Sequence, residues 1–403
     1  MDKIEYLIGD SSIEKESFLQ LNSGMLPPFS DEVCEFLDVL SKKIMKSAEA
    51  RKYQDVVALG FWCRKANILQ LKSRYEHFQN RLGRGLAFHI APSNVPINTY
   101  YTLFWGLLSG CRNIVRSTNK SFEQIDFVAD CINDILYNDF AELIKYICVV
   151  RYEKYTKWTE YFSGQCMLRV IWGGDETIEN ITKYRTNARC KDLKFADRYS
   201  FLVIDADAMQ QADMLELKDV ARKLYNDTFL NDQNACSTPH LFFWLKKDAS
   251  VNIEEVKNRF WEAFYNESKK YDLAESKCTE KYTHLCYELM CRNNVVNIKR
   301  YSNRIYRCVL NEIPDDVEML RGKFGMFYEY ESTEVFEILS KLSVKTQTCL
   351  FYGELKYNIM RVIEEHGMTC IDRIVPIGKS LDISELWDGY DIFGEMTRVI
   401  VNE

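Results

Sequence analysis

The sequence predicts an α/β protein with two domains, each built around a largely parallel sheet. Short apolar runs alternate with longer amphipathic segments along the chain, which is the pattern of consecutive βαβ units. With 403 residues the chain is long enough for two domains with sizeable cores. Its 47% hydrophobic and 28% charged residues are typical of a globular protein rather than a fibrous or disordered one.

The first expected elements are helical. Residues 31–80 repeat apolar side chains at helical spacing, as in Val33, Phe36, Leu37 and Leu40. A short apolar run at 86–90 then predicts a buried strand. It is followed at 91–96 by two prolines that bracket Ser93 and Asn94, and this spacing predicts a fixed, non-helical turn.

The alternation continues to residue 204. Further strands are expected at 113–116, 147–150, 168–172 and 201–204, with intervening helices at 100–108, 121–136, near 155–162 and from about 176. A helix between successive strands favours parallel pairing. We expect the strand at 201–204 to close the first domain. The second half repeats the pattern with longer helices at 256–271 and 281–291, and it ends near 373–378.

Charge and composition exclude several classes of protein. The formal net charge of −7 argues against a nucleic-acid binder, whose surface would be basic. Residues 1–30 lack the pattern of a secretory signal, and no run of 18 apolar residues predicts a membrane span. The 14 cysteines form no Cys-x-x-Cys pair and the 5 histidines no zinc-ligand spacing. We therefore expect reduced thiols, no metal site and a cytoplasmic location.

Two kinds of segment are candidates for chemistry. The loops at 91–96, 116–120 and 173–175 follow predicted strands, and in parallel sheets such loops bind the ligand. Residues 231–240 (NDQNACSTPH) place Cys236 among small polar residues, just before an apolar run at 241–244. At such a helix–strand junction, backbone amides and helix ends lower the pKa of a thiol, which favours a nucleophile.

Four segments together resemble one known family. They are residues 89–96 (HIAPSNVP), 106–116 (GLLSGCRNIVR), 233–240 (QNACSTPH), and 372–378 (DRIVPIG) with 387–391 (WDGYD). In this order they look like the acyl-CoA reductases of the LuxC type, which belong to the aldehyde dehydrogenase superfamily. The resemblance runs from about residue 85 to 395 and leaves the first 80 residues uncovered.

The resemblance implies an aldehyde dehydrogenase-like fold with two Rossmann-like domains. It implies four parts: an N-terminal helical segment that packs on the cofactor domain (1–84), an NADP-binding domain (85–204), a catalytic domain with the nucleophile (205–370), and a C-terminal return segment with an oligomerisation strand (371–403). Within the last part, residues 398–401 are the expected oligomerisation strand, so a homo-oligomer is implied.

The resemblance also assigns catalytic roles. Cys236 matches the nucleophile that attacks the carbonyl carbon. Asn94, between Pro92 and Pro96, matches the asparagine whose amide stabilises the oxyanion. His240 follows the nucleophile by four residues. It either tunes the thiolate or contacts the cofactor, and the alternative is a buried histidine with satisfied hydrogen bonds.

A second set of residues matches the family's cofactor site. Arg116 stands where relatives contact the cofactor's ribose or phosphate, and the alternative is a solvated cation at a strand end. The matching positions are Ser93, Arg116, Ser117, Thr118, Gly173 and Gly174. The two glycines also fit an ordinary strand-to-helix turn. Because Asn119 replaces the glutamate of many NAD-preferring relatives, no carboxylate opposes a 2′-phosphate, and we expect NADPH.

One departure from the superfamily narrows the expected reaction. Alignment through residues 205–207 puts Leu193 where hydrolytic aldehyde dehydrogenases carry a glutamate that activates water. Without that base a thioacyl enzyme persists until a thiol or a hydride reaches it, although Asp192 and Asp197 lie close in sequence. We therefore expect NADPH-dependent reduction of an acyl-CoA or acyl-carrier thioester to an aldehyde.

Alternatives remain open. Oxidation of an aldehyde with NAD(P) uses the same fold, and a non-catalytic scaffold for an acyl-AMP synthetase is the alternative of another class. The family also implies such a synthetase as a partner that supplies the acyl group. The aromatic residues at 260–265 have helical spacing, which favours core packing over an acyl tunnel.

Overall fold

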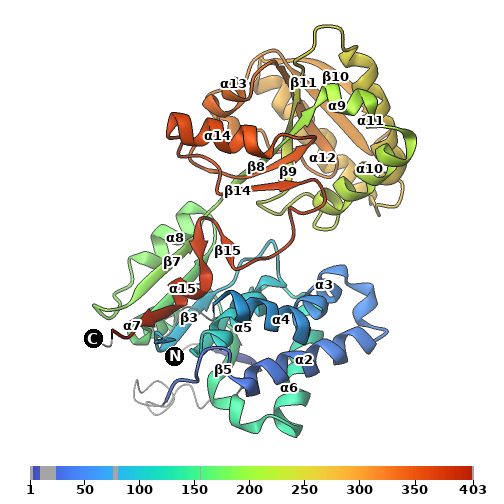
Figure 1. Ribbon diagram of the computed structural model, residues 1–403. Helices are drawn as coiled ribbons and strands as arrows, with labels where there is room; N and C mark the ends of the chain where they lie inside the picture. The colour runs from blue at the N-terminus through green and yellow to red at the C-terminus, as the bar shows by residue number, and fades with distance from the viewer. Residues whose placement is uncertain (1–2, 10–23, 76–79, 155, 402–403) are drawn as a thin grey trace. The chain divides into compact units, whose positions relative to one another are not determined.

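The structure is a computed structural model that describes residues 3–9, 24–75, 80–154 and 156–401 (Figure 1). The chain forms two compact units. Unit 1 comprises Met1–Ala196 with Tyr390–Glu403, and unit 2 comprises Asp197–Gly389. Each unit contains a sheet of mostly parallel strands with helices packed against it. The predicted α/β class is therefore confirmed.

Unit 1 is built on a six-stranded sheet. All neighbouring strands are parallel except β1 and β5. The order across the sheet is β1 (Glu5–Ile8), β5 (Ile147–Arg151), β4 (Arg112–Arg116), β3 (Leu86–Ile90), β6 (Leu168–Trp172) and β7 (Lys191–Phe195). The strand predicted at 86–90 is β3. All its residues are buried, because β3 has a neighbour at each edge and helices over both faces.

The helices of unit 1 are α2 (Asp31–Lys46), α3 (Gln54–Trp62), α4 (Lys65–Arg74), α5 (Asn98–Leu108), α6 (Glu123–Asn138), α7 (Trp158–Gln165), α8 (Asp175–Thr182) and α15 (Ile392–Met396), with 3-10 turns η2 (Ala50–Lys52) and η3 (Ala141–Tyr146). The predicted helical spacing in 31–40 is confirmed, since its four apolar residues are all buried in α2. Two neighbours in β3 face opposite layers: Phe88 packs on Phe162 of α7, and His89 contacts Thr102 of α5.

Unit 2 is built on a seven-stranded sheet in which only β10 and β11 pair antiparallel. The order is β10 (Val295–Tyr301), β11 (Ile305–Leu310), β12 (Met326–Ser332), β9 (Pro239–Leu245), β8 (Tyr199–Asp205), β13 (Thr346–Tyr352) and β14 (Arg373–Pro376). The strand predicted at 201–204 is β8, which lies inside this sheet. A buried apolar run predicts a strand but not the strands with which it pairs. The prediction that this strand closes the first domain therefore could not foresee its pairing with β9 and β13 of unit 2.

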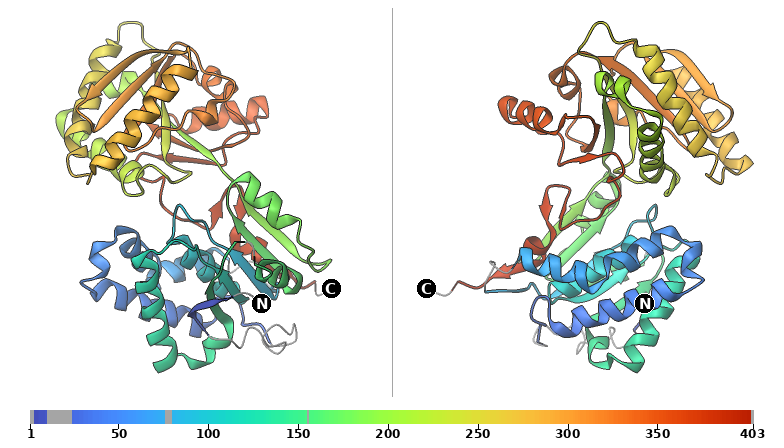
Figure 2. Two further views of the ribbon diagram at one scale, coloured as in Figure 1. Left: turned by 180° about the vertical axis from the view of Figure 1, so that it is seen from behind. Right: turned by 45° about the vertical axis from the view of Figure 1, so that its right-hand side comes forward.

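Helices cover both faces of the unit 2 sheet (Figure 2). Alternate residues of the central strands point to opposite cores, so Phe243 and Phe242 of β9 belong to different apolar clusters. The helices are α9 (Ala206–Gln211), α10 (Met214–Phe229), α11 (Ile253–Ser268), α12 (Glu275–Cys291), α13 (Val335–Ser340) and α14 (Lys356–His366), with η4 (Val317–Met319). Phe260, Trp261 and Phe264 of α11 are buried in the core, as their spacing predicts.

The last residues form short strands. β17 (Thr397–Val399) pairs antiparallel with β2 (Arg81–Gly83) of the same chain, and β15 (Leu386–Trp387) pairs with β16 (Tyr390–Asp391). The predicted strand at 398–401 thus overlaps β17, and its addition to a neighbouring chain's sheet stays a prediction. Within the described residues, no helix combines the length and apolar character needed to cross a membrane.

Candidate active site

Cys236 lies in the loop between α10 and β9, as its predicted position at a helix–strand junction requires. The loop turns sharply because Asp232 and Gln233 both adopt positive φ angles, of 52° and 63°. The Gln233 N–H donates to the carbonyl of Thr228 at 2.8 Å, which closes the end of α10. Left-handed backbone at two consecutive non-glycine residues is uncommon and needs support from the surroundings.

The side chain of Gln233 supplies part of that support. It is buried, and its side-chain amide forms two hydrogen bonds with the backbone of residues 325–326. The Nε2 group donates to the Met326 carbonyl at 2.9 Å, while Oε1 accepts from the Gly325 N–H at 2.8 Å. Lys277 adds an ion pair to Asp232 at 2.7 Å. The nucleophile loop is therefore fixed to the start of β12.

The backbone around Cys236 is held from two further directions. The Ser200 hydroxyl donates to the Cys236 carbonyl at 2.6 Å, and the Thr238 hydroxyl donates to the Asp227 carbonyl at 2.9 Å. These contacts tie the loop to β8 and to α10. Because backbone on each side of the cysteine is anchored, the position of its sulfur is set by the fold.

The electrostatic environment of Cys236 differs from the expectation. The residue is half-buried, and burial raises the pKa of its thiol above the usual value. The Arg198 backbone N–H works in the opposite direction by a hydrogen bond, and so does the charge of Arg321, whereas Asp197 and Asp388 raise the pKa further. The sequence predicted a lowered pKa for the Cys236 thiol. Within unit 2 this prediction was wrong, because desolvation outweighs the single amide donor.

His240 is a buried residue of β9 whose ring stacks on Tyr199, with ring centroids 5.9 Å apart. Burial lowers the pKa of His240 to about 3, with a smaller contribution from Arg321. The ring is therefore neutral near pH 7. Within the described part of the chain, its Nδ1 atom has no hydrogen-bond partner, so His240 does not match the alternative of a fully satisfied core histidine.

Unit 1 carries the other predicted residues at one edge of its sheet. The three candidate loops follow β3, β4 and β6, which are adjacent and parallel. Their carboxyl ends therefore share one edge, where ligands bind in such sheets. Ser93 and Asn94, in the loop after β3, are exposed, whereas the Pro96 that follows them is buried. The structure thus brings together the loop residues that the sequence selected for cofactor binding.

Arg116 ends β4, and its guanidinium contacts Tyr152, the residue that follows β5. It donates to the Tyr152 carbonyl at 3.2 Å and lies over the Tyr152 ring at 5.1 Å, so it is not simply a solvated cation. Its buried Nε has no partner among the described residues. Ser117 is fully buried, and the Thr118 hydroxyl accepts from the Lys120 N–H at 3.2 Å.

Gly173 and Gly174 form the turn from β6 into α8. A Cβ at Gly173 would lie 2.9 Å from a Thr177 side-chain carbon, so close packing requires glycine there. Gly174 is the N-cap of α8, has no side-chain cap, and a Cβ there would meet nothing within 4 Å. The N-terminus of α8 therefore has no side-chain cap, and helix N-termini favour anions such as a cofactor phosphate. The carboxylates of Asp175 and Glu176 in the same turn oppose an anion.

Leu193, which stands where hydrolytic relatives are expected to carry a general base, is a buried residue of β7. The two carboxylates near it in sequence are both committed to arginines in bidentate pairs: Asp192 to Arg169 at 2.7 and 2.9 Å, and Asp197 to Arg321 at 2.8 and 2.9 Å. Neither carboxylate is therefore disposed to activate water.

Two acidic residues of unit 2 lie in environments that the sequence did not predict: Asp227, and Asp388 of the segment 387–391. Asp227 is buried, and its carboxylate accepts from the Gly378 N–H and from both the N–H and the hydroxyl of Ser380. Burial raises the pKa of Asp227 to about 6, and it raises that of Asp388 to the same value. Asp227 lies on the apolar face of α10. A carboxylate at such a position in the sequence indicates a buried acid with hydrogen-bond partners.

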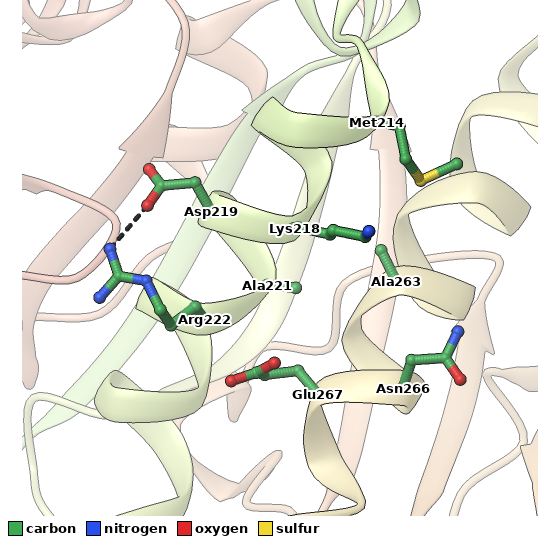
Figure 3. A pocket seen from close by; sticks show the side chains of 8 residues that line it. All are labelled: Met214, Lys218, Asp219, Ala221, Arg222, Ala263, Asn266 and Glu267. Atoms are coloured by element: carbon green, nitrogen blue, oxygen red, sulfur yellow. Dashed lines mark hydrogen bonds and ion pairs between the residues drawn. The ribbon is translucent and has the colours of Figure 1, made fainter.

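A separate groove of about 440 Å³ lies between α10 and α11. Its walls carry Met214 at one end and the ion pair of Asp219 with Arg222 at the other (Figure 3). It contains none of the predicted site residues. Among the described residues no cluster of three or more His, Cys, Asp or Glu side chains is suited to hold a metal ion.

Solved structures with the same fold are aldehyde dehydrogenases. Lactaldehyde dehydrogenase superposes with a TM-score of 0.66 at 12% identity, over 97% of this chain and 88% of that one. Aldehyde dehydrogenase from Bartonella henselae gives 0.65 at 12% identity, over 99% and 96%. Glyceraldehyde-3-phosphate dehydrogenase GapN from Methanocaldococcus jannaschii, complexed with NADP, gives 0.65 at 14% identity, over 97% and 91%. The predicted aldehyde dehydrogenase-like fold is confirmed.

The sequence itself matches a family model described as acyl-CoA reductase (LuxC) over residues 26–399. No curated protein sequence matches the chain. The match begins within the first 80 residues, ahead of the segments that carried the resemblance. Since it covers nearly the whole chain, the chain belongs to the acyl-CoA reductase (LuxC) family of oxidoreductases.

Proposed function

We propose that the protein reduces an acyl thioester, carried by CoA or by an acyl-carrier protein, to an aldehyde with NADPH. The acyl group passes through a covalent thioester on Cys236. The observation that carries this proposal is the set of anchors that fix the cysteine loop, namely Gln233, Ser200 and Thr238. A loop held this firmly presents a sulfur in one orientation, as a nucleophile requires.

Acyl transfer to Cys236 balances without a further reactant. The Cys236 sulfur bonds to the acyl carbon, the bond from that carbon to the CoA or carrier sulfur breaks, and the thiol proton passes to the departing thiolate. The Arg198 N–H stabilises the Cys236 thiolate against the cost of burial. Asn94, in its proline-bracketed loop, is proposed to donate its amide to the oxyanion.

A bound nicotinamide cofactor supplies the hydride that brings the thioacyl carbon to the aldehyde level. The chain's own part in this step is to release the Cys236 sulfur as a thiolate when the carbonyl reforms. The apolar Leu193 and the arginine-paired Asp192 and Asp197 leave this segment without a base for water. Retention of the acyl group until reduction supports aldehyde release over acid release.

The residues that would hold the cofactor lie at the carboxyl edge of the unit 1 sheet. The N-terminus of α8 at Gly174, which has no side-chain cap, suits the pyrophosphate, and Arg116 with Ser117 and Thr118 suits the ribose and its 2′-phosphate. The unpartnered Nε of Arg116 is a donor that a ligand would satisfy. This set supports NADPH.

NADH is a second candidate, which one observation favours. The Glu153 carboxylate, just past β5, accepts a hydrogen bond from the Asn119 side-chain amide at 3.1 Å. It thus brings a negative charge next to Asn119, the residue that replaces the glutamate of many NAD-preferring relatives. A carboxylate at this place repels a 2′-phosphate. The test is the ratio of kcat/KM for NADPH to that for NADH in wild type and Glu153→Gln. A ratio below one that rises severalfold in the variant establishes NADH.

The proposed reaction is tested by cofactor consumption against acyl-CoA thioesters of increasing chain length. Wild type is compared with Cys236→Ala, and Cys286→Ala serves as the matched control because Cys286 is a half-buried cysteine of α12. We expect turnover in wild type and in the control but none in Cys236→Ala. Acid release from an aldehyde that outpaces aldehyde release from acyl-CoA would instead establish an aldehyde dehydrogenase.

The proposed partners follow from the same chemistry. An acyl-AMP synthetase subunit is the proposed acyl donor, and a homo-oligomer is proposed through the C-terminal strand. A non-catalytic scaffold for such a synthetase is the competing proposal. It predicts that the protein's biological activity survives Cys236→Ala, whereas the enzymatic proposal predicts its loss.

A further inference from the structure

Two cysteines outside the proposed active site are in direct contact. Cys166 follows α7 at the entry to β6, and Cys190 precedes β7. β6 and β7 are adjacent and parallel, with Leu168 paired to Lys191, so the two cysteines lie at the starts of neighbouring strands. Their sulfur atoms are 3.7 Å apart, and both are free thiols.

The two thiols have different access to solvent. Cys166 is fully buried in the apolar cluster that includes Phe88 and Phe162, whereas Cys190 lies half-buried at its edge. A dissolved oxidant therefore meets Cys190 first. Cys166 then stands behind it as a second thiol already within contact distance, which is the arrangement of an attacking and a resolving cysteine.

The surroundings also favour a thiolate on Cys190, the more accessible of the two. The contact between the two sulfur atoms, in which either can be the donor, lowers the pKa of Cys190 and raises that of Cys166. The buried guanidinium of Arg169 adds a smaller effect of the same sign on Cys190, whereas burial and the Asp192 carboxylate oppose it. Thiolate character and access together govern the oxidation of a cysteine.

We propose that Cys190 and Cys166 form a reversible, peroxide-reactive disulfide site in unit 1. In the first step the Cys190 sulfur attacks a peroxide oxygen, the O–O bond breaks, and hydroxide leaves to give a sulfenic acid. In the second step the Cys166 sulfur attacks the Cys190 sulfur, the S–O bond breaks and water leaves. Two electrons pass from the two thiols to the peroxide, and a small thiol reverses the reaction by exchange.

The position of the bridge determines its effect on the fold. It closes a ring that runs through β6, Gly173 with Gly174, and α8 back to β7. The bridge joins the starts of the two strands, whereas the glycine turn lies at the opposite, carboxyl edge. We therefore expect oxidation to raise the melting temperature, since a cross-link restricts the unfolded chain, and to leave nucleotide binding by unit 1 intact.

Peptide mapping of the full chain tests this site. The reduced protein is treated with hydrogen peroxide, its remaining thiols are alkylated, and it is digested without reductant. We expect a linked pair of peptides containing Cys166 and Cys190, about 2 Da lighter than the sum of the free peptides and lost on treatment with dithiothreitol. The melting temperature of the oxidised protein is expected to rise in wild type and to stay unchanged in Cys190→Ser.

Two variants separate this site from general thiol oxidation. Cys166→Ala is expected to let Cys190 proceed to sulfinic acid and to slow its alkylation severalfold near pH 7.5, because the contact with the second sulfur, which lowers the pKa of Cys190, is gone. Cys148→Ala, at a buried cysteine of the same apolar cluster, is the control and is expected to retain the linked peptides. Over-oxidised Cys190 without cross-link in wild type, or Cys190 less reactive than Cys286, would overturn the proposal.

Discussion

At the scale of single residues, the proposed reaction depends on how the chain positions Cys236. Its place before β9 was predicted from the small polar residues around it and the apolar run that follows. The direction of its pKa shift was not, because burial in a turn depends on segments far away in sequence, such as Arg198 and Asp388.

Asn94 is the residue whose proposed role is most directly tested by kinetics. Asn94→Ala removes the amide proposed to stabilise the oxyanion, and loss of one such donor lowers kcat by about 10²–10³. Because Asn94 is exposed in unit 1, the melting temperature is expected to stay unchanged. Steady-state rates with a saturating acyl-CoA provide the measurement. A kcat within a factor of two of wild type would contradict the role.

The buried His240 predicts how the free energy of unfolding depends on pH. Its pKa in the folded protein is about 3, below the value near 6.5 of an unfolded histidine. The unfolded state therefore binds more protons between these values, and the free energy of unfolding rises with pH by up to about 1.4 kcal/mol per pH unit across that window. We expect His240→Gln to remove this increment. Denaturant titrations from pH 4 to 7 that show equal pH slopes for both proteins would contradict it.

At the scale of elements, α10 does more than precede the nucleophile loop. Asp227, near its C-terminal end, holds the segment 378–380 through three donors, and its carbonyl accepts from Thr238. One helix thereby fixes both the cysteine loop and part of the C-terminal signature at 372–378. The shared anchor explains why two segments far apart in the sequence are positioned together within unit 2.

Replacement of Asp227 by asparagine tests that anchor. An asparagine amide presents an N–H where the carboxylate accepted one, so at least one buried donor loses its partner. We expect the free energy of unfolding to fall by about 1–3 kcal/mol, measured by urea denaturation. Asp219→Asn, on the exposed side of the same helix, is the control and is expected to change stability little. Equal effects of the two substitutions would refute the anchoring role.

The central strands of unit 1 were predictable from the sequence, but their partners in the sheet were not. The runs at 86–90, 147–150 and 168–172 are mostly apolar and almost entirely buried, including the polar His89 and Arg169, because helices cover both faces of a parallel sheet. β7 was not predicted, since its edge position leaves polar residues between apolar ones. Gln233 was missed for a different reason, because its role comes from contacts with β12 some ninety residues away.

At the scale of the whole molecule, the proposed chemistry divides between the two units. Unit 2 holds Cys236 and its anchors, and unit 1 holds the loops at the carboxyl edge of its sheet. The disulfide site at Cys166 and Cys190 belongs to unit 1 alone and does not depend on the reaction proposed for Cys236. Failure of one proposal therefore leaves the other standing.

The central claim is that Cys236 carries the acyl group. The most direct test is the intact mass of the full-length protein after exposure to an acyl-CoA without cofactor. We predict one added acyl group in wild type, released by hydroxylamine, and none in Cys236→Ala, although that variant retains 13 of the 14 cysteines. An unmodified wild-type protein, or an equal adduct on Cys236→Ala, would contradict the account.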